Sequence, residues 1–459
     1  MAEQATNASE GLLRTLLRRG GIDRAVGWVI VGRSWALVAG PLTIFLIGTR
    51  LSAAEQGYYY TYSNILSLAM LFELGLGGWI TRFASYEFAK LHWTEEGKLA
   101  GDSVAQRRLS SILRFAVRWY AGAALLVFVV IFPAGFLFFK SQPGSEAVGW
   151  LLPWLLVVAV GSCNAVLAPF FSLLEGCGLV AQMARLQFFR AISGNLAFWS
   201  SLLIGLGLLS APILGAAGII CSAFYLLARR RLFVRLWQSE VPAATSFQWK
   251  RELLPLQWRT AVTFAAGYLA WQTANPILFR LAGPEEAGKL GMSLNLCTMI
   301  QAFGMAWLNT KVPRMSGLLA QGDKKALDAL FSRSFLQAML VVALGGITLL
   351  LASIALRLVN NSLSGRLLAP MQIGLLLLST LASTAQIALV LYVRTYKQEP
   401  FVGQMIALGI AMPIVCYLTG LTWGATGMLA GMTGVNMVLG LWWTLGIFRS
   451  HRRGQESHG

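Results

Sequence analysis

The stretch RELLPLQWRTAVTFAAGYLAWQTANPILFRLAGPEEAGKLG, residues 251–291, decides how this chain is organised. A long apolar run fills most of it, and one arginine, Arg259, lies well inside that run. The run ends at Arg280 and Leu281, after which two glutamates and Gly288 follow. An apolar run longer than about 20 residues predicts a helix that crosses a membrane.

A similar arrangement opens the first half of the chain. There Arg33 lies inside an apolar run, which ends at Arg50 and is followed by Glu55 and Gly57. Arg50 and Arg280 lie 230 positions apart, about half of the 459 residues. This spacing favours an internal repeat, which is typical of transporters built from two related halves. The alternative is chance similarity between apolar helices that end in short loops.

Composition predicts that the whole chain is embedded in a membrane. Hydrophobic residues make up 56% of the sequence and charged residues only 12%, and the mean hydropathy is +0.63. Soluble domains carry about 25% charged residues, so this deficit predicts an all-α polytopic membrane protein. We expect no cleaved signal, because the basic N-terminal part leads into a membrane-length run without a small-residue cleavage site.

About twelve segments are long and apolar enough to be transmembrane helices, six in each half. The break between the fifth and sixth is the least distinct and is marked only by Ser210–Pro212. The predicted spans are residues 27–49, 58–81, 115–139, 150–173, 185–209, 211–227, 253–279, 290–309, 335–356, 367–393, 401–418 and 422–448.

Lysine and arginine are distributed very unevenly among the loops. With the N-terminus in the cytoplasm, 28 of the 37 lie on the cytoplasmic side and six lie outside, while Arg33, Arg190 and Arg259 lie within spans. This is the pattern of the positive-inside rule, and it predicts that both termini are cytoplasmic. It also explains most of the net charge of +18 without a nucleic-acid partner.

An even number of spans in each half makes the two halves parallel repeats, related by an axis along the membrane normal. Two long inner segments, Arg82–Arg114 and Lys311–Arg333, contain amphipathic sequence that we expect to lie as helices along the cytoplasmic membrane face. The expected domains are an N-terminal segment with a six-helix bundle (1–228), a cytoplasmic linker (229–252), a second six-helix bundle (253–448) and a cytoplasmic tail (449–459).

The sequence lacks the motifs that indicate enzymatic chemistry. It contains no zinc-protease, nucleophile-elbow or P-loop motif, so no enzyme activity, ATP-driven transport, metal or cofactor is predicted. The cysteines have no close partner in the sequence, and we expect buried thiols without a disulfide framework or a zinc site. They are Cys163, Cys177, Cys221, Cys297 and Cys416.

The three arginines within spans are the candidates for binding an anion. A charge at the centre of a span costs about 2.5–3.5 kcal/mol, so it tends to face a partner or a wet cavity. A cavity lined by Arg33, Arg190 and Arg259 would be cationic, and guanidinium groups suit phosphate or pyrophosphate oxygens. The alternative is that these side chains, which lie near the inner ends of their spans, extend to the cytoplasmic headgroups.

Four further residues are candidates for contact with a transported molecule. Glu73 is the one acid clearly inside a predicted span; we favour an ion pair with an arginine over proton or sodium coupling. Tyr268, Trp271 and Gln272 share one face of the seventh span because they are three and four positions apart. Aromatic rings beside an amide suit sugar rings, although they are also common in interface belts and in core packing.

Two stretches resemble a known family. Residues 50–87, RLSAAEQGYYYTYSNILSLAMLFELGLGGWITRFASYE, and residues 257–294, QWRTAVTFAAGYLAWQTANPILFRLAGPEEAGKLGMSL, resemble bacterial polysaccharide-biosynthesis membrane proteins. These are the Wzx-type (O-antigen) flippases of the multidrug/oligosaccharidyl-lipid/polysaccharide exporter superfamily. The resemblance in topology covers the whole chain, whereas the amino-acid sequence itself is similar only in these two stretches.

The resemblance implies two six-helix bundles around a central cavity that works by alternating access. The implied cargo is an undecaprenyl-pyrophosphate-linked oligosaccharide, moved from the inner to the outer leaflet of the bacterial cytoplasmic membrane. Arg33 and Arg259 match the cavity arginines that such flippases are thought to place against the pyrophosphate. Membrane lipids, a polysaccharide polymerase and assembly proteins are the implied partners.

Other functions remain as alternatives. A cation-coupled multidrug antiporter of the same superfamily would need cavity acids, and the spans offer little beyond Glu73. A membrane glycosyltransferase or polymerase would show paired carboxylates or a large external loop rich in arginine and histidine. A scaffold for polysaccharide assembly would have the same sequence features as a flippase. No motif specifies the glycan, the coupling ion or the oligomeric state.

Overall fold

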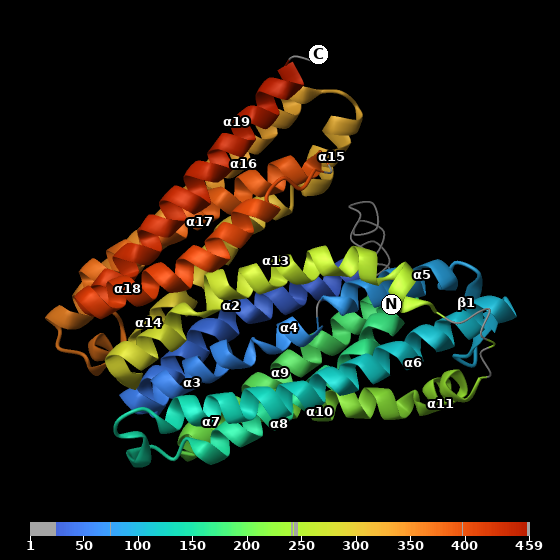
Figure 1. Cartoon of the computed structure of the whole chain (residues 1–459), viewed down its shortest axis with the longest axis horizontal. Helices are drawn as coiled ribbons and strands as arrows, with labels where there is room; N and C mark the ends of the chain where they lie inside the picture. The colour runs from blue at the N-terminus through green and yellow to red at the C-terminus, as the bar shows by residue number, and fades with distance from the viewer. Residues whose placement is uncertain (1–23, 74, 240–241, 243–246, 397, 457–459) are drawn as a thin grey trace, which may run out of the picture. The chain divides into compact units, whose positions relative to one another are not determined.

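The computed structural model describes residues 24–73, 75–239, 242, 247–396 and 398–456 (Figure 1). Within these ranges, the side chains at positions 24, 145, 250, 251, 255–260, 362 and 454–456 are outside the description. Helices form almost all of the described chain, and the exception is one short hairpin. The prediction of an all-α membrane protein is confirmed.

The elements follow one another as a series of long helices joined by short turns. The first half contains α2 (Arg24–Arg50), α3 (Ala53–Leu66), α4 (Ala69–Glu73), α5 (Leu76–Phe88), β1 (Leu91–Trp93), β2 (Leu99–Gly101), α6 (Ser103–Leu126), the π-helical turn η1 (Val127–Ile131), α7 (Phe132–Lys140), η2 (Ser145–Ala147), α8 (Leu151–Gly176), α9 (Val180–Ile204), η3 (Gly207–Leu209), α10 (Ser210–Ala228) and α11 (Arg230–Gln238). The second half contains α12 (Trp249–Glu252), α13 (Leu254–Gln272), α14 (Ala274–Asn309), α15 (Val312–Ala320), α16 (Lys324–Leu358), η5 (Ser362–Arg366), α17 (Pro370–Thr395), α18 (Val402–Val435), the π-helical η6 (Asn436–Trp442) and α19 (Trp443–Glu456).

Each of the twelve predicted spans coincides, within a few residues, with helical segments. Seven described helices are long and apolar enough to cross a membrane, and the bent pair Ala53–Glu73 and Leu76–Phe88 would make eight. One of the seven, Val402–Arg453, contains two predicted spans, and near the start of the second Gly424 leaves helical geometry with a φ of 59°. The chain is therefore a multi-pass membrane protein.

The seventh predicted span consists of two helices rather than one. α13 ends at Gln272 and α14 begins at Ala274, so Pro276 lies in the first turn of α14, where no intrahelical N–H bond is required. α14 is itself interrupted at Gly283, whose φ of 87° lies in the left-handed region that glycine tolerates. The helix that follows Gly283 corresponds to the eighth predicted span.

The described chain divides into two compact units. The first is Met1–Thr43, Phe72–Pro133 and Leu152–Gln257, and the second is Ile44–Leu71, Ala134–Leu151 and Trp258–Gly459. Two segments of the first half, which include α3 and most of α7, therefore pack with helices of the second half. The division into bundles at 1–228 and 253–448 stays a prediction.

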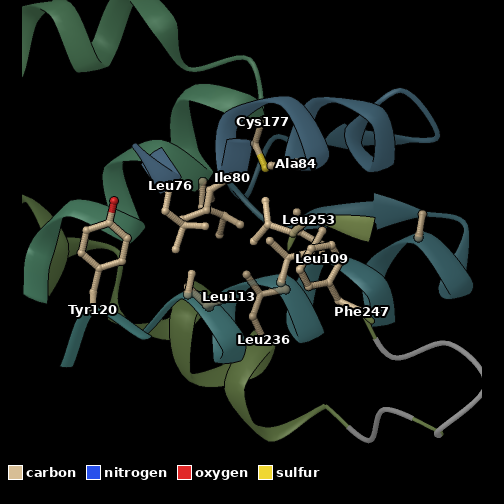
Figure 2. Packing of buried hydrophobic residues seen from close by; sticks show 14 of the residues in the cluster. Leu76, Ile80, Ala84, Leu109, Leu113, Tyr120, Cys177, Leu236, Phe247 and Leu253 are labelled. Atoms are coloured by element: carbon tan, nitrogen blue, oxygen red, sulfur yellow. The ribbon is translucent and has the colours of Figure 1, made fainter. Parts of the chain in front are cut away.

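The first unit has a buried hydrophobic core on the side of the hairpin (Figure 2). Side chains from α5 and α6 meet there, and the apolar face of α11 packs on the same cluster. Leu109 and Leu113 of α6 are fully buried, and Leu236 of α11 is 7% exposed. The basic RRRLFVR sequence, predicted to lie in a linker, is thus largely a helix anchored by its leucines.

A hairpin occupies the segment after α5, where we expected amphipathic helix. β1 pairs with β2 in antiparallel register, with Leu91 opposite Gly101. The indole Nε1 of Trp93 donates a hydrogen bond to the carbonyl oxygen of Cys177, at 2.8 Å. Aromatic residues favour strands, and Gly97 with a φ of 70° permits the turn. The helix expected over SYEFAKLHW, residues 85–93, was therefore wrong at Leu91–Trp93, which form β1.

Two long helices begin on the predicted cytoplasmic side with aspartate caps. Asp102 accepts a hydrogen bond from the backbone N–H of Val104 at the start of α6, at 2.9 Å. Asp323 accepts one from Ala326 at the start of α16, also at 2.9 Å. Such caps satisfy N–H groups that a first helical turn leaves unpaired. The amphipathic sequence at residues 104–115 and 323–335 therefore belongs to the first turns of two long helices, while the separate short helix α15 precedes α16.

The contact between α3 and α14 is the tightest in the second unit. A Cβ at Gly57 would lie 1.8 Å from the carbonyl oxygen of Pro284, and one at Gly288 would lie 2.9 Å from the backbone nitrogen of Gly57. Gln56 Nε2 donates to the carbonyl oxygen of Gly288 at 2.8 Å. Asn275 Nδ2 donates to Thr61 Oγ1 at 3.1 Å. The two segments that the sequence pairs as a repeat thus lie against each other, through the glycines that they share.

The cysteines follow the prediction only in part. Cys177, Cys297 and Cys416 are buried, while Cys163 is exposed and Cys221 is half-buried. Burial raises the pKa of Cys177, which follows α8, to about 12. The prediction of buried thiols was wrong for Cys163, because this residue lies on a face of α8 that no described neighbouring element covers.

Candidate functional site

One face of α13 lines a cavity of about 770 Å³ within the second unit. Phe264, Gly267, Tyr268, Trp271 and Gln272 contribute to its wall. Their spacing of three and four positions places them along a single stripe of the helix. The structure therefore brings together Tyr268, Trp271 and Gln272, three of the four residues of this helix that the sequence predicts as candidates.

Hydrogen bonds to α3 hold this face of α13 in position. Tyr268 donates its hydroxyl to the carbonyl oxygen of Asn64 at 3.2 Å. Asn64 Nδ2 donates to Gln272 Oε1 at 2.6 Å. Tyr268 is only 8% exposed, whereas Trp271 is 42% exposed. Tyr268 and Gln272 therefore anchor the helix, and Trp271 presents its ring to the cavity.

Removing the Asn64–Gln272 hydrogen bond should lower stability by a small, measurable amount. Asn64→Leu leaves the Gln272 amide without this partner, so we expect a loss of about 1–2 kcal/mol in the free energy of unfolding. Because Gln272→Leu removes the other partner, the double variant should recover part of the loss. We expect a coupling of about 1 kcal/mol in a double-mutant cycle measured by denaturation in detergent. Strictly additive losses would contradict the bond.

An ion pair also lines the cavity. Arg394 Nε lies 2.9 Å from Glu399 Oε1, and its Nη2 donates to Glu399 Oε2 at 3.3 Å, so two contacts join the guanidinium to the carboxylate. Both side chains are about half exposed. Arg394 lies at the end of α17, and Glu399 precedes α18. The cavity thus combines aromatic rings, an amide and a solvent-accessible guanidinium.

Sequence reasoning assigned Arg394 only to the cytoplasmic loop charges. The available signal was the pair of opposite charges five positions apart, on either side of the turn between the tenth and eleventh predicted spans. Such a pair predicts a local salt bridge. It does not indicate the proximity to α13, since that depends on tertiary packing between segments more than 100 residues apart.

The arginines predicted within spans have different surroundings. Arg190 Nη2 donates to Asn164 Oδ1 at 2.6 Å, and its guanidinium lies 5.4 Å from the centre of the Phe171 ring. Both contacts come from α8, so Arg190 links α9 to α8 within the first unit. Arg33 is exposed on α2 in the same unit. The side chain of Arg259 lies outside the described residues, and its role stays a prediction.

Glu73 ends α4 and is half-buried. In the part of the chain that the structure describes, it forms no ion pair. One turn further on, a Cβ at Gly77 would lie 3.5 Å from the hydroxyl of Tyr120, a buried residue of α6. Pairing of Glu73 with an arginine and coupling by Glu73 both stay predictions.

Comparisons with known proteins place the fold. No protein-family model matches the sequence, and no curated protein matches it. The structure of lipid II flippase MurJ in an inward closed conformation matches 92% of this chain and 87% of its own, with a TM-score of 0.66 and 12% identity.

Multidrug transporters give similar matches. An inward-facing transporter of the MATE family, in the MOP superfamily, matches 91% of this chain and 99% of its own, with a TM-score of 0.56 and 11% identity. A MOP superfamily transporter from Pyrococcus furiosus matches 93% and 95%, with a TM-score of 0.52 and 13% identity. The chain therefore has the fold of these membrane transporters over almost its whole length.

Proposed function

We propose that this protein is a flippase that moves an undecaprenyl-pyrophosphate-linked oligosaccharide from the inner to the outer leaflet of a bacterial cytoplasmic membrane, for polysaccharide or O-antigen synthesis. The single observation that carries the proposal is the α13 cavity, in which aromatic rings, an amide and a guanidinium line one space. The fold shared with a lipid II flippase and with transporters solved in inward and outward states supports alternating access.

The aromatic wall supports the sugar part of the cargo. Phe264 and Trp271 are 38% and 42% exposed, so both can offer a ring to the flat apolar side of a sugar. Gln272 lies beside them and can hydrogen-bond to hydroxyl groups. Pockets of this kind, mostly apolar with a few fixed polar groups, bind and orient ligands.

The guanidinium supports the pyrophosphate. Arg394 already uses two of its donors on a carboxylate, and phosphate oxygens fit the same planar arrangement. In the sequence, Arg259 precedes Thr263 and Gln272 by four and thirteen positions, and Thr263 lines the cavity. A spacing of four is that of neighbours on one helix face, so we propose Arg259 as a second contact.

If the pyrophosphate replaces Glu399 as the partner of Arg394, substitutions of Arg394 and of Glu399 should have opposite effects on the affinity for the lipid. Arg394→Gln removes a charged donor, and we expect the affinity for undecaprenyl diphosphate to fall about tenfold or more. Glu399→Gln removes the competing carboxylate and should raise the affinity several-fold. Equilibrium binding of undecaprenyl diphosphate to the purified protein measures both. Equal losses in the two variants would contradict this exchange, because they would indicate a purely structural ion pair.

The first unit supplies further candidates under this proposal. Arg33 is exposed, and Arg190 is held in a fixed position by Asn164 and Phe171, so each can contact an anionic group within that unit. Glu73 stays a candidate for an ion pair with an arginine, and proton or sodium coupling is the alternative. The same proposal includes the sequence-based topology, with two six-helix bundles and both termini cytoplasmic. A polymerase and assembly proteins are its proposed partners.

A cation-coupled multidrug antiporter is the second candidate, favoured by the MATE transporters that share the fold. Its cargo would stack on the same aromatic residues, Phe264 and Trp271. The described cavity lining contains one carboxylate, Glu399, and this group is already paired with Arg394. An organic cation would therefore find no uncompensated acid among the described lining residues, which is why we favour the flippase.

Proteoliposomes distinguish the two functions. We would measure transbilayer movement of a labelled undecaprenyl-diphosphate oligosaccharide and, in parallel, accumulation of ethidium under a proton or sodium gradient. We expect the lipid-linked glycan to cross the bilayer faster with the protein than in protein-free vesicles. The double variant Arg33→Ala with Arg259→Ala should reduce that rate. Accumulation of ethidium, with no movement of any of several labelled glycans tested, would contradict the flippase and favour the antiporter.

A further inference from the structure

A second cavity, of about 910 Å³, lies within the first unit. The β1–β2 hairpin and α6 form one part of its wall, and the junction of α10 with α11 forms the other. The positive-inside count places this junction on the cytoplasmic side. None of the residues that line it belongs to the α13 cavity.

Basic residues dominate this cavity. Arg229, Arg230, Arg231 and Arg235 all contribute to its lining, together with Lys98 of the hairpin turn. The described lining has a single carboxylate, that of Glu96, which forms a salt bridge with Lys98. The hydrogen bond and the charge of Lys98 lower the pKa of Glu96, so this carboxylate stays ionised and paired. The four arginines are therefore left with an excess of positive charge.

One of these arginines is held in place, and three are available. The guanidinium carbon of Arg229 lies 4.1 Å from the centre of the Tyr225 ring, and its Nη2 donates to Gln182 Oε1 at 2.6 Å. Arg231 and Arg235 are exposed and form no salt bridge among the described residues, although the charge of Arg235 also helps to lower the pKa of Glu96. The cavity thus offers one guanidinium group held by its neighbours and others that are exposed, and guanidinium groups bind phosphate oxygens.

The exposed apolar surface beside the cavity favours a lipid as the source of that phosphate. α10 is one of the helices apolar enough to cross a membrane, and Leu227 in its last turn both lines the cavity and is 60% exposed. On α11, Leu236 packs into the core while Val234 and Trp237 remain exposed. A short helix with buried leucines, exposed tryptophan and arginines is typical of the membrane interface.

We propose that this cavity binds the phosphate headgroup of an anionic phospholipid from the cytoplasmic leaflet. The acyl chains would lie along the exposed apolar surface of α10, and the headgroup phosphate would contact Arg231 and Arg235. The site is separate from the proposed cargo cavity and does not depend on what the protein transports. An inorganic phosphate ion has the same chemistry without the chains, so the test compares the two.

The test measures thermal stabilisation of the full-length protein in detergent by short-chain lipids, since a ligand that binds the folded state raises its melting temperature. The probes are dioctanoyl phosphatidylglycerol, dioctanoyl phosphatidylcholine, glycerol phosphate and inorganic phosphate. Arg231→Gln with Arg235→Gln is compared with Lys325→Gln plus Arg333→Gln, an exposed basic pair on α16 that does not line the cavity. Both variants lose two charges, so nonspecific electrostatic attraction is matched.

We expect phosphatidylglycerol to stabilise the wild type more than phosphatidylcholine or either soluble phosphate does. Each removed arginine should weaken this binding about fivefold, and the double variant about 30-fold, while the α16 pair leaves it unchanged. Equal weakening by the two double variants would overturn the site. Stabilisation by inorganic phosphate without stabilisation by phosphatidylglycerol would overturn the assignment to a lipid. Unchanged melting temperatures without lipid show that the variants are folded.

Discussion

Gly267→Trp is expected to stop cargo movement while leaving the protein folded. Gly267 lines the α13 cavity, and a Cβ placed there meets no atom within 4 Å. The indole can therefore enter the cavity without displacing the backbone of a neighbouring helix. Tryptophan also has a higher helix propensity than glycine, by a few tenths of a kcal/mol. We expect transport of the lipid-linked glycan to fall to the rate of protein-free vesicles.

Gly374→Trp is the matched control for this variant. Gly374 lies within α17, has equally open space around its Cβ position, and does not line the cavity. It should keep both the melting temperature and the transport rate of the wild type. Wild-type transport by Gly267→Trp would show that the cargo takes another path. A melting temperature that falls only for Gly267→Trp would indicate that the position is packed rather than open.

Gly57→Ala adds a single methyl group and is expected to lower the free energy of unfolding strongly. The new Cβ would lie 1.8 Å from the carbonyl oxygen of Pro284, closer than any real contact, so α3 and α14 must move apart. Separation also strains the Gln56 bond to Gly288. Overpacking of this kind costs about 1–3 kcal/mol, and contact with backbone places it at about 3 kcal/mol.

The control for this prediction is Gly374→Ala, which adds the same methyl group inside a helix. Nothing lies within 4 Å of its Cβ, so alanine should be neutral or stabilise by up to about 1 kcal/mol through helix propensity. Denaturation of both purified variants in detergent measures the difference. Equal stability of Gly57→Ala and Gly374→Ala would show that α3 and α14 do not pack through these glycines.

The helices could be predicted from the sequence because a membrane imposes one dominant requirement. A span must be apolar over about 20 residues, so each membrane-crossing segment can be recognised from its hydropathy. The internal repeat stays a prediction, but its matching glycines, Gly57 and Gly288, do lie in contact in the structure. Sequence alone did not indicate the contact itself, because spacing along a chain carries no information about which helices meet.

The candidate site was predictable on one side only. A spacing of three and four positions on α13 was enough to group Tyr268, Trp271 and Gln272. The partners of that face, Asn64 on α3 and Arg394 in the last turn of α17, are separated from it by more than 100 residues and needed the tertiary structure. The hairpin at Leu91–Gly101 was missed for a related reason. Its strands are three residues long, too short for a periodic signal.

Photochemical capture of cargo at the α13 cavity would test the central claim most directly. Trp271 is replaced by p-benzoylphenylalanine, an aromatic residue of similar shape, in the full-length protein. Trp423, which is 72% exposed and does not line the cavity, receives the same replacement as a control. The probe is undecaprenyl diphosphate that carries one labelled sugar.

The proposal predicts a covalent adduct with the labelled lipid at position 271, reduced by an excess of unlabelled lipid, and little or none at position 423. Equal labelling at both positions, or labelling at 423 alone, would contradict a cargo site on this face of α13.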